Sequence, residues 1–177
     1  MNSLCDQGII AALYEASAAG VEIELIVRGI CCLKVGIPGV SEHISVRSIV
    51  GTFLEHSRIY YFQNGGEEEI YLSSADWMPR NLDRRVEILF PVENEHLKKE
   101  VMHILDIQLK DTLKAQVKKS DGTYEKVDRR GKQPLCAQQY FMDYARKLAK
   151  GGNAVGVDDA TVYGWAVHYY DEDDIKV

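Results

Sequence analysis

The sequence predicts an α/β fold, a mixed sheet flanked by helices, and three observations carry this prediction. An amphipathic helical pattern near the start leads into residues 21–27, where alternation gives way to a fully apolar run typical of a strand inside a sheet. Residues 93–109 place leucine, isoleucine and valine at helical spacing. Glycine turns at residues 64–66 and 120–123 separate pairs of short apolar runs and indicate hairpins. A helix followed by a strand is half of an α/β unit.

The remaining elements follow from capping and turn residues. The first helix is expected to begin at Ser3, with Asp6 completing a capping-box-like start, and to end at Gly20. A loop over residues 28–43 follows the first strand. The other expected strands are residues 44–50, 58–62, 70–72, 85–90, 115–118 and 124–127, and the later helices are residues 93–109 and 134–147.

These elements indicate one domain over residues 1–150, followed by a tail over residues 151–177 of lower order. The glycines at 151 and 152 break the last helix, although the apolar run at residues 162–167 could still dock as a strand. A chain of 177 residues is long enough for one domain with a real core.

Composition excludes several classes of protein. No run of eighteen apolar residues is present, so no membrane span is expected, and the first residues lack the pattern of a secretory signal. The four cysteines form no C-x-x-C pair, so zinc is not expected, and we expect reduced thiols in the cytoplasm. The net charge of −6 argues against nonspecific nucleic-acid binding, although a basic cleft in an acidic protein can still hold an anion.

The segment with the most chemical information begins at His56. His56 and Arg58 stand at the mouth of the first predicted hairpin, which ends in Ser73, Ser74 and Asp76. An imidazole can act as a nucleophile or general acid/base near neutral pH. A cation neutralises phosphate oxygens, and hydroxyl groups with backbone amides stabilise developing charge. The grouping is therefore typical of phosphoryl-handling sites.

This grouping resembles the signature of the phospholipase D superfamily, H-x-K-x4-D followed by G-S-x-N. The matching positions are His56, Arg58, Ser74 and Asp76. The sequence departs from the motif because Arg58 replaces lysine, Ser73 replaces glycine and Gln63 stands where aspartate belongs. The hairpin between the two halves is also longer than in the motif.

A longer resemblance, over roughly residues 1–148, is to the C-terminal region of bacterial polyphosphate kinases. The similar segments are residues 2–6, 26–31, 49–51, 53–60, 71–78, 80–81 and 84–87. The resemblance implies two phospholipase D-like domains in tandem and reversible transfer of the terminal phosphate of ATP onto polyphosphate through a phosphohistidine. It implies ATP/ADP and polyphosphate as substrates, and Mg²⁺ in the full-length enzyme.

The resemblance also assigns roles to residues. The phosphorylated histidine, a partner tyrosine and the magnesium-associated arginines belong to segments that precede this chain, so no metal ligand is expected here. His56 corresponds to the second active-site histidine, and Arg28 to the arginine that contacts nucleotide phosphates. Arg28 also lies just past a buried strand, where α/β sheets bind ligands. Possible polyphosphate contacts or orienters are Arg58, Ser73, Ser74, Asp76, Arg80 and Asn81.

The expected partners are ATP, polyphosphate, the preceding domains of the same enzyme and, in the full-length protein, further copies of it. A cytoplasmic location is expected, with peripheral membrane association of the parent left open. Two alternatives remain: a phospholipase D-like phosphodiesterase half-site that dimerises to pair two copies of His56, and a noncatalytic anion-binding module. The chain alone is expected to be inactive, because the nucleophilic histidine lies elsewhere.

Overall fold

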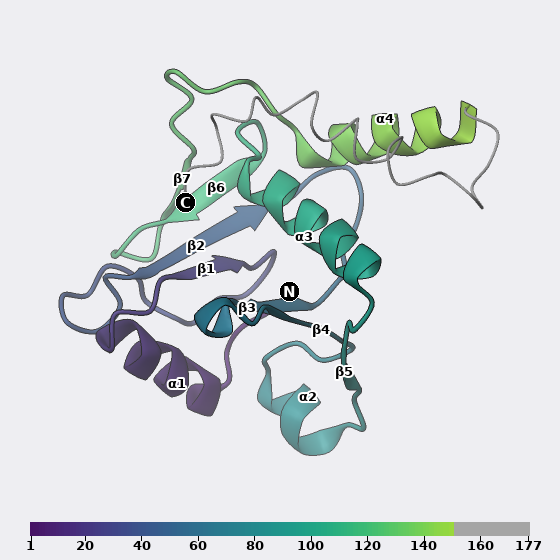
Figure 1. Ribbon diagram of the computed structural model, residues 1–177. Coiled ribbons are helices and arrows are strands. Elements are labelled where there is room, and N and C mark those ends of the chain that lie inside the picture. Colours follow the sequence, from purple (N-terminus) through teal and green to yellow (C-terminus); the bar gives the residue numbers. More distant parts are fainter. Residues whose placement is uncertain (151–177) are drawn as a thin grey trace. The chain divides into compact units, whose positions relative to one another are not determined.

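The computed structural model describes residues 1–150 (Figure 1). The chain divides into two compact units, Met1–Gln138 and Gln139–Val177, and every strand of the described residues lies in the first. The predicted α/β fold, with a mixed sheet flanked by helices, is confirmed. The predicted boundary at residue 150 stays a prediction, and the strand considered at residues 162–167 lies outside the described part of the chain.

The larger sheet contains four strands in the order β1-β2-β6-β7. These are β1 (Ile23–Ile26), β2 (Ile44–Ile49), β6 (Ala115–Lys118) and β7 (Tyr124–Lys126). β1 and β2 run parallel, whereas β6 pairs antiparallel with both β2 and β7, which makes the sheet mixed. The hairpin predicted around residues 120–123 is the β6–β7 pair.

The smaller sheet is an antiparallel meander of β3 (Ile59–Phe62), β4 (Glu69–Ser73) and β5 (Leu89–Pro91). β3 and β4 form the predicted hairpin, and a short 3₁₀ turn, η1 (Asn64–Gly66), occupies its tip. β5 is shorter than the strand predicted over residues 85–90, because residues 85–88 form part of a loop. In that loop Ile88 bonds Ser74 beyond the end of β4, and Glu87 accepts hydrogen bonds from the side chains of Ser74 and Asn81.

The helices are α1 (Gln7–Ala18), α2 (Pro79–Arg84), α3 (Glu95–Leu109) and α4 (Ala137–Lys150). The sequence analysis did not predict α2, and it placed the start of α1 too early. Asp6 is the N-cap of α1, since its carboxylate accepts a hydrogen bond from the amide of Ile9 at 2.9 Å. Residues 3–5 stay extended, which is the reason that Ser3 does not cap the helix.

The core of the first unit lies between α1 and the larger sheet. The apolar face of α1, with Ile9, Ile10 and Leu13, packs on a cluster of buried side chains. That cluster contains Leu4, Leu25, Val27, Leu33, Val35, Ile44 and Val46. In β2, Ile44 and Val46 are buried on either side of the exposed Ser45, as period-2 side-chain geometry requires, and in β1 Leu25 is buried.

The first residues of the chain connect the two sheets. Leu4 is fully buried and forms parallel bridges with Cys31, which follows β1, and with Trp77, which follows β4. Its amide donates to the carbonyl of Ile30 at 2.8 Å. The backbone of Asn2 and Ser3 is therefore held beside the ends of strands from both sheets, which is where the candidate site lies. No helix among residues 1–150 is long and apolar enough to cross a membrane.

Candidate active site

The centre of the candidate site is a buried ion pair between Arg58 and Asp76. Arg58 directly precedes β3, and Asp76 follows the end of β4, so the hairpin brings them together. The guanidinium Nε lies 3.1 Å from Asp76 Oδ1, and Nη2 lies 2.8 Å from Oδ2. The side chains are 8% and 7% exposed. This is the bidentate geometry that a planar guanidinium gives and an ammonium does not.

His56 lies on the other edge of the same guanidinium. Nη1 of Arg58 donates to the His56 carbonyl at 2.9 Å and lies 3.0 Å from the imidazole Nδ1. Nη2 lies 3.1 Å from Nε2 of the same ring. Because a guanidinium has only donors, a hydrogen bond here needs a lone pair on the facing imidazole nitrogen. His56 itself is exposed, so a buried ion pair supports a ring that solvent can reach.

The pKa of Asp76 reflects these contacts. Burial alone would raise the pKa, but hydrogen bonds from Arg58 and from two backbone amides, together with the Arg58 charge, outweigh burial and lower it. The amides belong to Asn2 and Ser3, which lie 2.8 and 3.2 Å from Oδ1. Asp76 is therefore a carboxylate at neutral pH.

Arg28 joins the cluster through Asn2. The side-chain oxygen of Asn2 accepts a hydrogen bond from Arg28 Nη2 at 2.5 Å. Arg28 lies past the carboxyl end of β1 and is half-buried. Among the described residues, its Nε is a buried donor without an acceptor. A buried guanidinium N–H without a partner is costly, and an anion would satisfy it.

The loop that leads to His56 is fixed by glutamine side chains. Gln138 donates to the carbonyl of Phe53 at 2.8 Å and accepts from its amide at 3.1 Å. Gln138 and Gln108 donate to the two carboxylate oxygens of Glu55 at 3.2 and 3.1 Å. The sequence analysis missed this clamp, because both glutamines lie more than 50 residues from the loop in the chain.

The predicted residues Ser73, Ser74 and Asn81 hold a loop rather than face an open space. Ser73 donates to the carbonyl of Ile88 at 2.8 Å. Ser74 donates to Glu87, and Asn81 Nδ2 donates to the other Glu87 oxygen at 2.6 Å. These hydrogen bonds, that from Ser74 first, lower the pKa of Glu87. Glu87 is thus a network residue that the sequence analysis matched to the family but did not single out.

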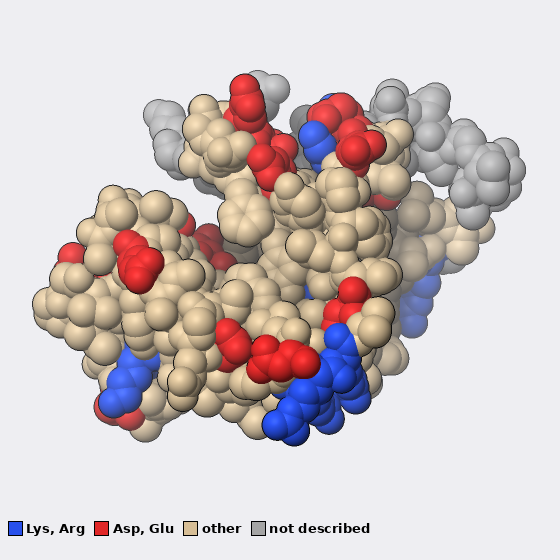
Figure 2. Space-filling view, turned by 90° about the horizontal axis from the view of Figure 1, so that it is seen from below, with Lys and Arg blue, Asp and Glu red and all other residues tan. Residues whose placement is uncertain are grey.

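Arg80 differs from these residues because it is exposed. It belongs to α2, which also carries Arg84 and is followed by Arg85, and all three are exposed. Figure 2 shows Lys and Arg side chains gathered on the face seen from below, where α2 lies. The structure therefore offers Arg80 to a ligand in solution, while Arg58 is enclosed.

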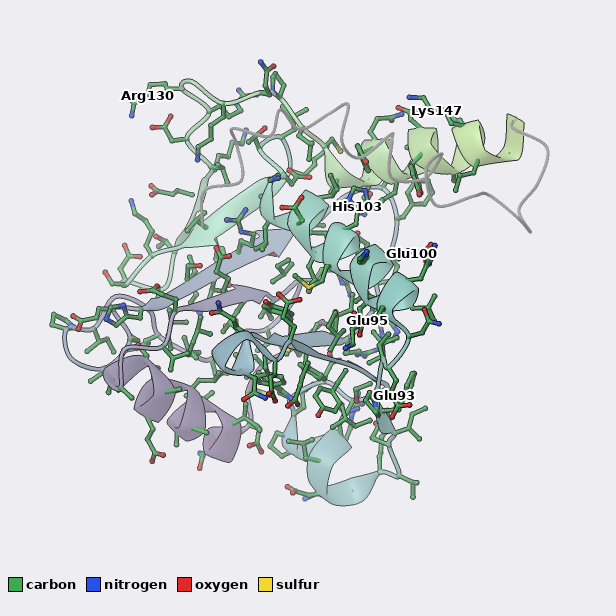
Figure 3. The ribbon with its side chains drawn as sticks, in the orientation of Figure 1. Glu93, Glu95, Glu100, His103, Arg130 and Lys147 are labelled. Atoms are coloured by element: carbon green, nitrogen blue, oxygen red, sulfur yellow. The ribbon has the colours of Figure 1, made fainter. Side chains whose placement is uncertain are left out.

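The described residues do not fit a magnesium site. Glu93, Glu95, Glu100 and His103 are spread along α3 and the segment before it rather than turned to one point (Figure 3). Within residues 1–150, no group of three His, Cys, Asp or Glu side chains could hold a metal ion. Both oxygens of Asp76 already accept hydrogen bonds. The described residues therefore give no basis for a reaction step at a magnesium ion held by this chain.

A cavity of about 1610 Å³ lies beside the cluster. Residues of both sheets and of α3 line it, including Arg28, Glu55, Ser57 and Tyr60. His56 is not among the lining residues, so a shared cleft for His56 and Arg28 stays a prediction. The structure connects these two residues by a series of contacts instead.

Comparison with known proteins identifies the domain. Residues 1–138 match the family model described as polyphosphate kinase C-terminal domain 2. The chain belongs to this family. All of the cluster from Asn2 to Asp76, and the Gln138 clamp, lie inside the matched residues of the polyphosphate kinase domain. The resemblance noted in the sequence is therefore confirmed.

Polyphosphate kinases from several bacteria are similar to the chain. That of Halalkalibacterium halodurans is 55% identical over 150 residues, which are 84% of this chain and 21% of the relative. That of Pseudomonas aeruginosa is 59% identical over 133 residues, 75% of this chain and 19% of the relative. A crystal structure of polyphosphate kinase from Porphyromonas gingivalis superposes with a TM-score of 0.80 at 45% identity, covering 85% of this chain and 23% of that one. The chain thus spans about a fifth of the length of these relatives.

Proposed function

We propose that the chain forms one side of the phosphotransfer site of a polyphosphate kinase. In this proposal the terminal phosphoryl group of ATP passes to a histidine outside the chain, ADP leaves, and the phosphohistidine then transfers the group to the terminal oxygen of polyphosphate. The reaction also runs in reverse. The observation that carries the proposal is the His56–Arg58–Asp76 cluster, connected to Arg28, inside the matched family domain.

His56 is proposed to act as the general acid/base or to hold the transferring phosphoryl group. Its ring is exposed and fixed on one side only, so the other side is open to a substrate. Phosphoryl transfer depends mainly on positioning and charge neutralisation, and a held imidazole supplies both a directed proton and a fixed contact.

Arg28 is proposed to bind nucleotide phosphates. The unpartnered Nε–H and the position past a strand end support this role. Arg80 is proposed to contact polyphosphate, since it is exposed on α2. A magnesium ion would neutralise phosphate charge in the full-length enzyme, with ligands from outside these residues. Cytoplasmic location, peripheral attachment to the membrane and assembly of several copies belong to the same proposal.

The test is a chimeric enzyme, the H. halodurans polyphosphate kinase with its matched segment replaced by this chain. We expect ATP-dependent polyphosphate synthesis, and we expect His56→Ala to lower kcat by about 10²–10⁴-fold, the usual range for a general acid/base. The matched control is His96→Ala, because His96 lies on α3 beside Glu100, 3.6 Å away, outside the cluster.

Other outcomes would point to the alternatives. A folded His56→Ala chimera within about threefold of the parent would make His56 structural and remove the proposed role. Hydrolysis of a phosphodiester by the 177-residue chain alone, lost in His56→Ala, would favour the phosphodiesterase half-site. Binding of polyphosphate without any effect on chimera turnover would favour an anion-binding module.

A further inference from the structure

The guanidinium of Arg58 is enclosed by groups of the protein. A guanidinium carries five N–H groups. Those of Arg58 face the two oxygens of Asp76, the carbonyl of His56 and the two imidazole nitrogens, at 2.8–3.1 Å. The side chain is 8% exposed. A neutral imidazole has one acceptor nitrogen, so the protein accepts four of the five N–H groups and the fifth faces the His56 ring. Since every N–H is turned toward Asp76 or His56 and the side chain is buried, Arg58 does not present the open fork that a phosphate-binding cation needs at its place in the motif.

The carboxylate of Asp76 is held by several donors as well. Oδ1 accepts from the amides of Asn2 and Ser3 and from Arg58 Nε, and Oδ2 accepts from Arg58 Nη2. Three donors crowd Oδ1, whereas Oδ2 accepts one hydrogen bond. Because its side chain is only 7% exposed, Asp76 is enclosed against a metal or a substrate hydroxyl group.

The pair connects two groups that are far apart in sequence. On one side Arg58 orients the imidazole of His56. On the other side Asp76 fixes the backbone of Asn2, whose side chain holds Arg28 at 2.5 Å. A change in the pair thus changes both the imidazole and the guanidinium.

We infer that the buried Arg58–Asp76 pair is a positioning unit that sets His56 and Arg28 together and does not itself contact polyphosphate. The inference rests on the proposed function, since it assigns the supports of that same site. Displacement of a reacting group by about 1 Å can cost about 10²-fold in rate, so a positioning unit acts on kcat. A cation that binds polyphosphate directly acts instead on the KM for polyphosphate.

The decisive variant in the chimeric enzyme is Arg58→Met/Asp76→Asn. Replacing a buried ion pair by neutral groups is often tolerated, and the asparagine keeps an oxygen for the amides of Asn2 and Ser3. We expect a folded enzyme with kcat lowered by about 10²-fold, an unchanged KM for polyphosphate within about twofold, and a raised KM for ATP. Circular dichroism and the thermal midpoint report the fold.

Three further variants separate the contributions. Asn2→Ala removes the side-chain hydrogen bonds to Arg28 and Ser3 but keeps the backbone contact with Asp76, so the KM for ATP should rise by more than kcat falls. Arg80→Ala removes an exposed cation, so the KM for polyphosphate should rise instead. Arg58→Lys keeps the charge without the planar fork and should lower kcat by about tenfold. Arg58→Lys decides the question if the double variant does not fold.

The result that would overturn the inference is a rise in the KM for polyphosphate with kcat unchanged, in either Arg58 variant. A folded double variant with the kcat of the parent would also contradict the inference, because the pair would then serve the fold and not the position of His56. Both results are distinct from a failure of the proposed function, which shows as a fully active His56→Ala chimera.

Discussion

The molecule contains two buried carboxylates with different surroundings, Asp76 and Asp111. Asp111 is 1% exposed and lies after the end of α3, where, within residues 1–150, its oxygens accept hydrogen bonds from four backbone amides. Those amides belong to Leu113, Lys114, Ala115 and Ala137, at 2.7–3.0 Å. Asp76 shares two amides with a guanidinium that also contacts an exposed imidazole.

The difference separates a carboxylate that holds the fold from one that supports a site. Asp111 joins the start of β6 to the start of α4, and both partners are backbone. Asp76 joins backbone to a charged side chain, and that side chain reaches the surface through His56. Burial therefore does not tell a structural carboxylate from one that supports a site, because both residues are buried. The partner at the far end of the network is what distinguishes them.

The largest expected effect is on the free energy of unfolding, which should fall more in Asp76→Asn than in Asp111→Asn. Asp76→Asn leaves the Arg58 guanidinium buried without its counter-ion, which costs about 3–5 kcal/mol. Asp111→Asn keeps one oxygen for three amides and leaves the amide of Ala137 facing an NH₂ group, which costs about 1–3 kcal/mol. Urea unfolding of the 177-residue chain measures both. Equal losses would show that the cation adds nothing to the burial of Asp76.

The second prediction concerns pH. The pKa of Asp76 is lowered in the folded chain, so its carboxylate contributes stability above the unfolded-state pKa of about 3.9. That contribution is lost as the pH falls through the folded-state pKa, because the protonated group no longer pairs with Arg58. The difference in unfolding free energy between wild type and Asp76→Asn should therefore be constant from pH 7 to pH 5 and shrink below about pH 4. A constant difference down to pH 2 would contradict the lowered pKa.

A third prediction tests Arg28, which Asp76 reaches through Asn2. In the chimeric enzyme, Arg28→Ala should raise the KM for ATP by about tenfold and also lower kcat, since the guanidinium would hold the nucleotide before and during transfer. Arg28→Lys should recover only part of the loss, because an ammonium keeps the charge but not the fork. Steady-state kinetics in both directions measures this. An unchanged KM for ATP would remove Arg28 from the nucleotide site.

The smallest effect is expected near Asp111. A Cβ on Gly51 would lie 2.2 Å from Oε1 of Gln138, the residue after the one that Asp111 binds. Gly51→Ala should destabilise the chain by about 1–3 kcal/mol through overpacking. The control is Gly8→Ala on the exposed side of α1, where the added Cβ would lie 3.3 Å from Oδ1 of Asp6 and the gain in helix propensity opposes that contact, so the free energy of unfolding should change by less than about 1 kcal/mol. An unchanged free energy of unfolding in Gly51→Ala would show that the Gln138 side chain moves aside without cost.

The sequence predicts part of this site and not the rest, for physical reasons. His56, Arg58 and Asp76 lie within one hairpin and its flanks, so a short motif reveals them. Asn2 contacts Asp76 across 74 positions, and Gln138 contacts Glu55 across 83, distances over which no local pattern reports a hydrogen bond. Asp111 gave no signal, since a carboxylate that binds only amides resembles any aspartate near a helix end.

The fold, too, was predicted where the signal is local and missed where distant contacts decide. The hairpins around residues 64–66 and 120–123 were predicted because glycine turns and strand patterns are local. α2 was missed because a helix of 6 residues is too short to show a period. The start of α1 was misplaced because Ser3 and Asp6 can both cap a helix, and the pairing of Leu4 with Cys31 and Trp77 decides between them.

The central claim is that His56 depends on the Arg58–Asp76 pair, and a double-mutant cycle on kcat of the chimeric enzyme tests it most directly. The pair is replaced by Arg58→Met/Asp76→Asn in the parent and in His56→Ala. We predict a loss of about 10²-fold in the parent and of less than about threefold in His56→Ala, because the imidazole is then gone and the remaining branch, to Arg28 through Asn2, acts chiefly on the KM for ATP. The same fold loss in both backgrounds would show that the pair and His56 act independently, and would contradict the account.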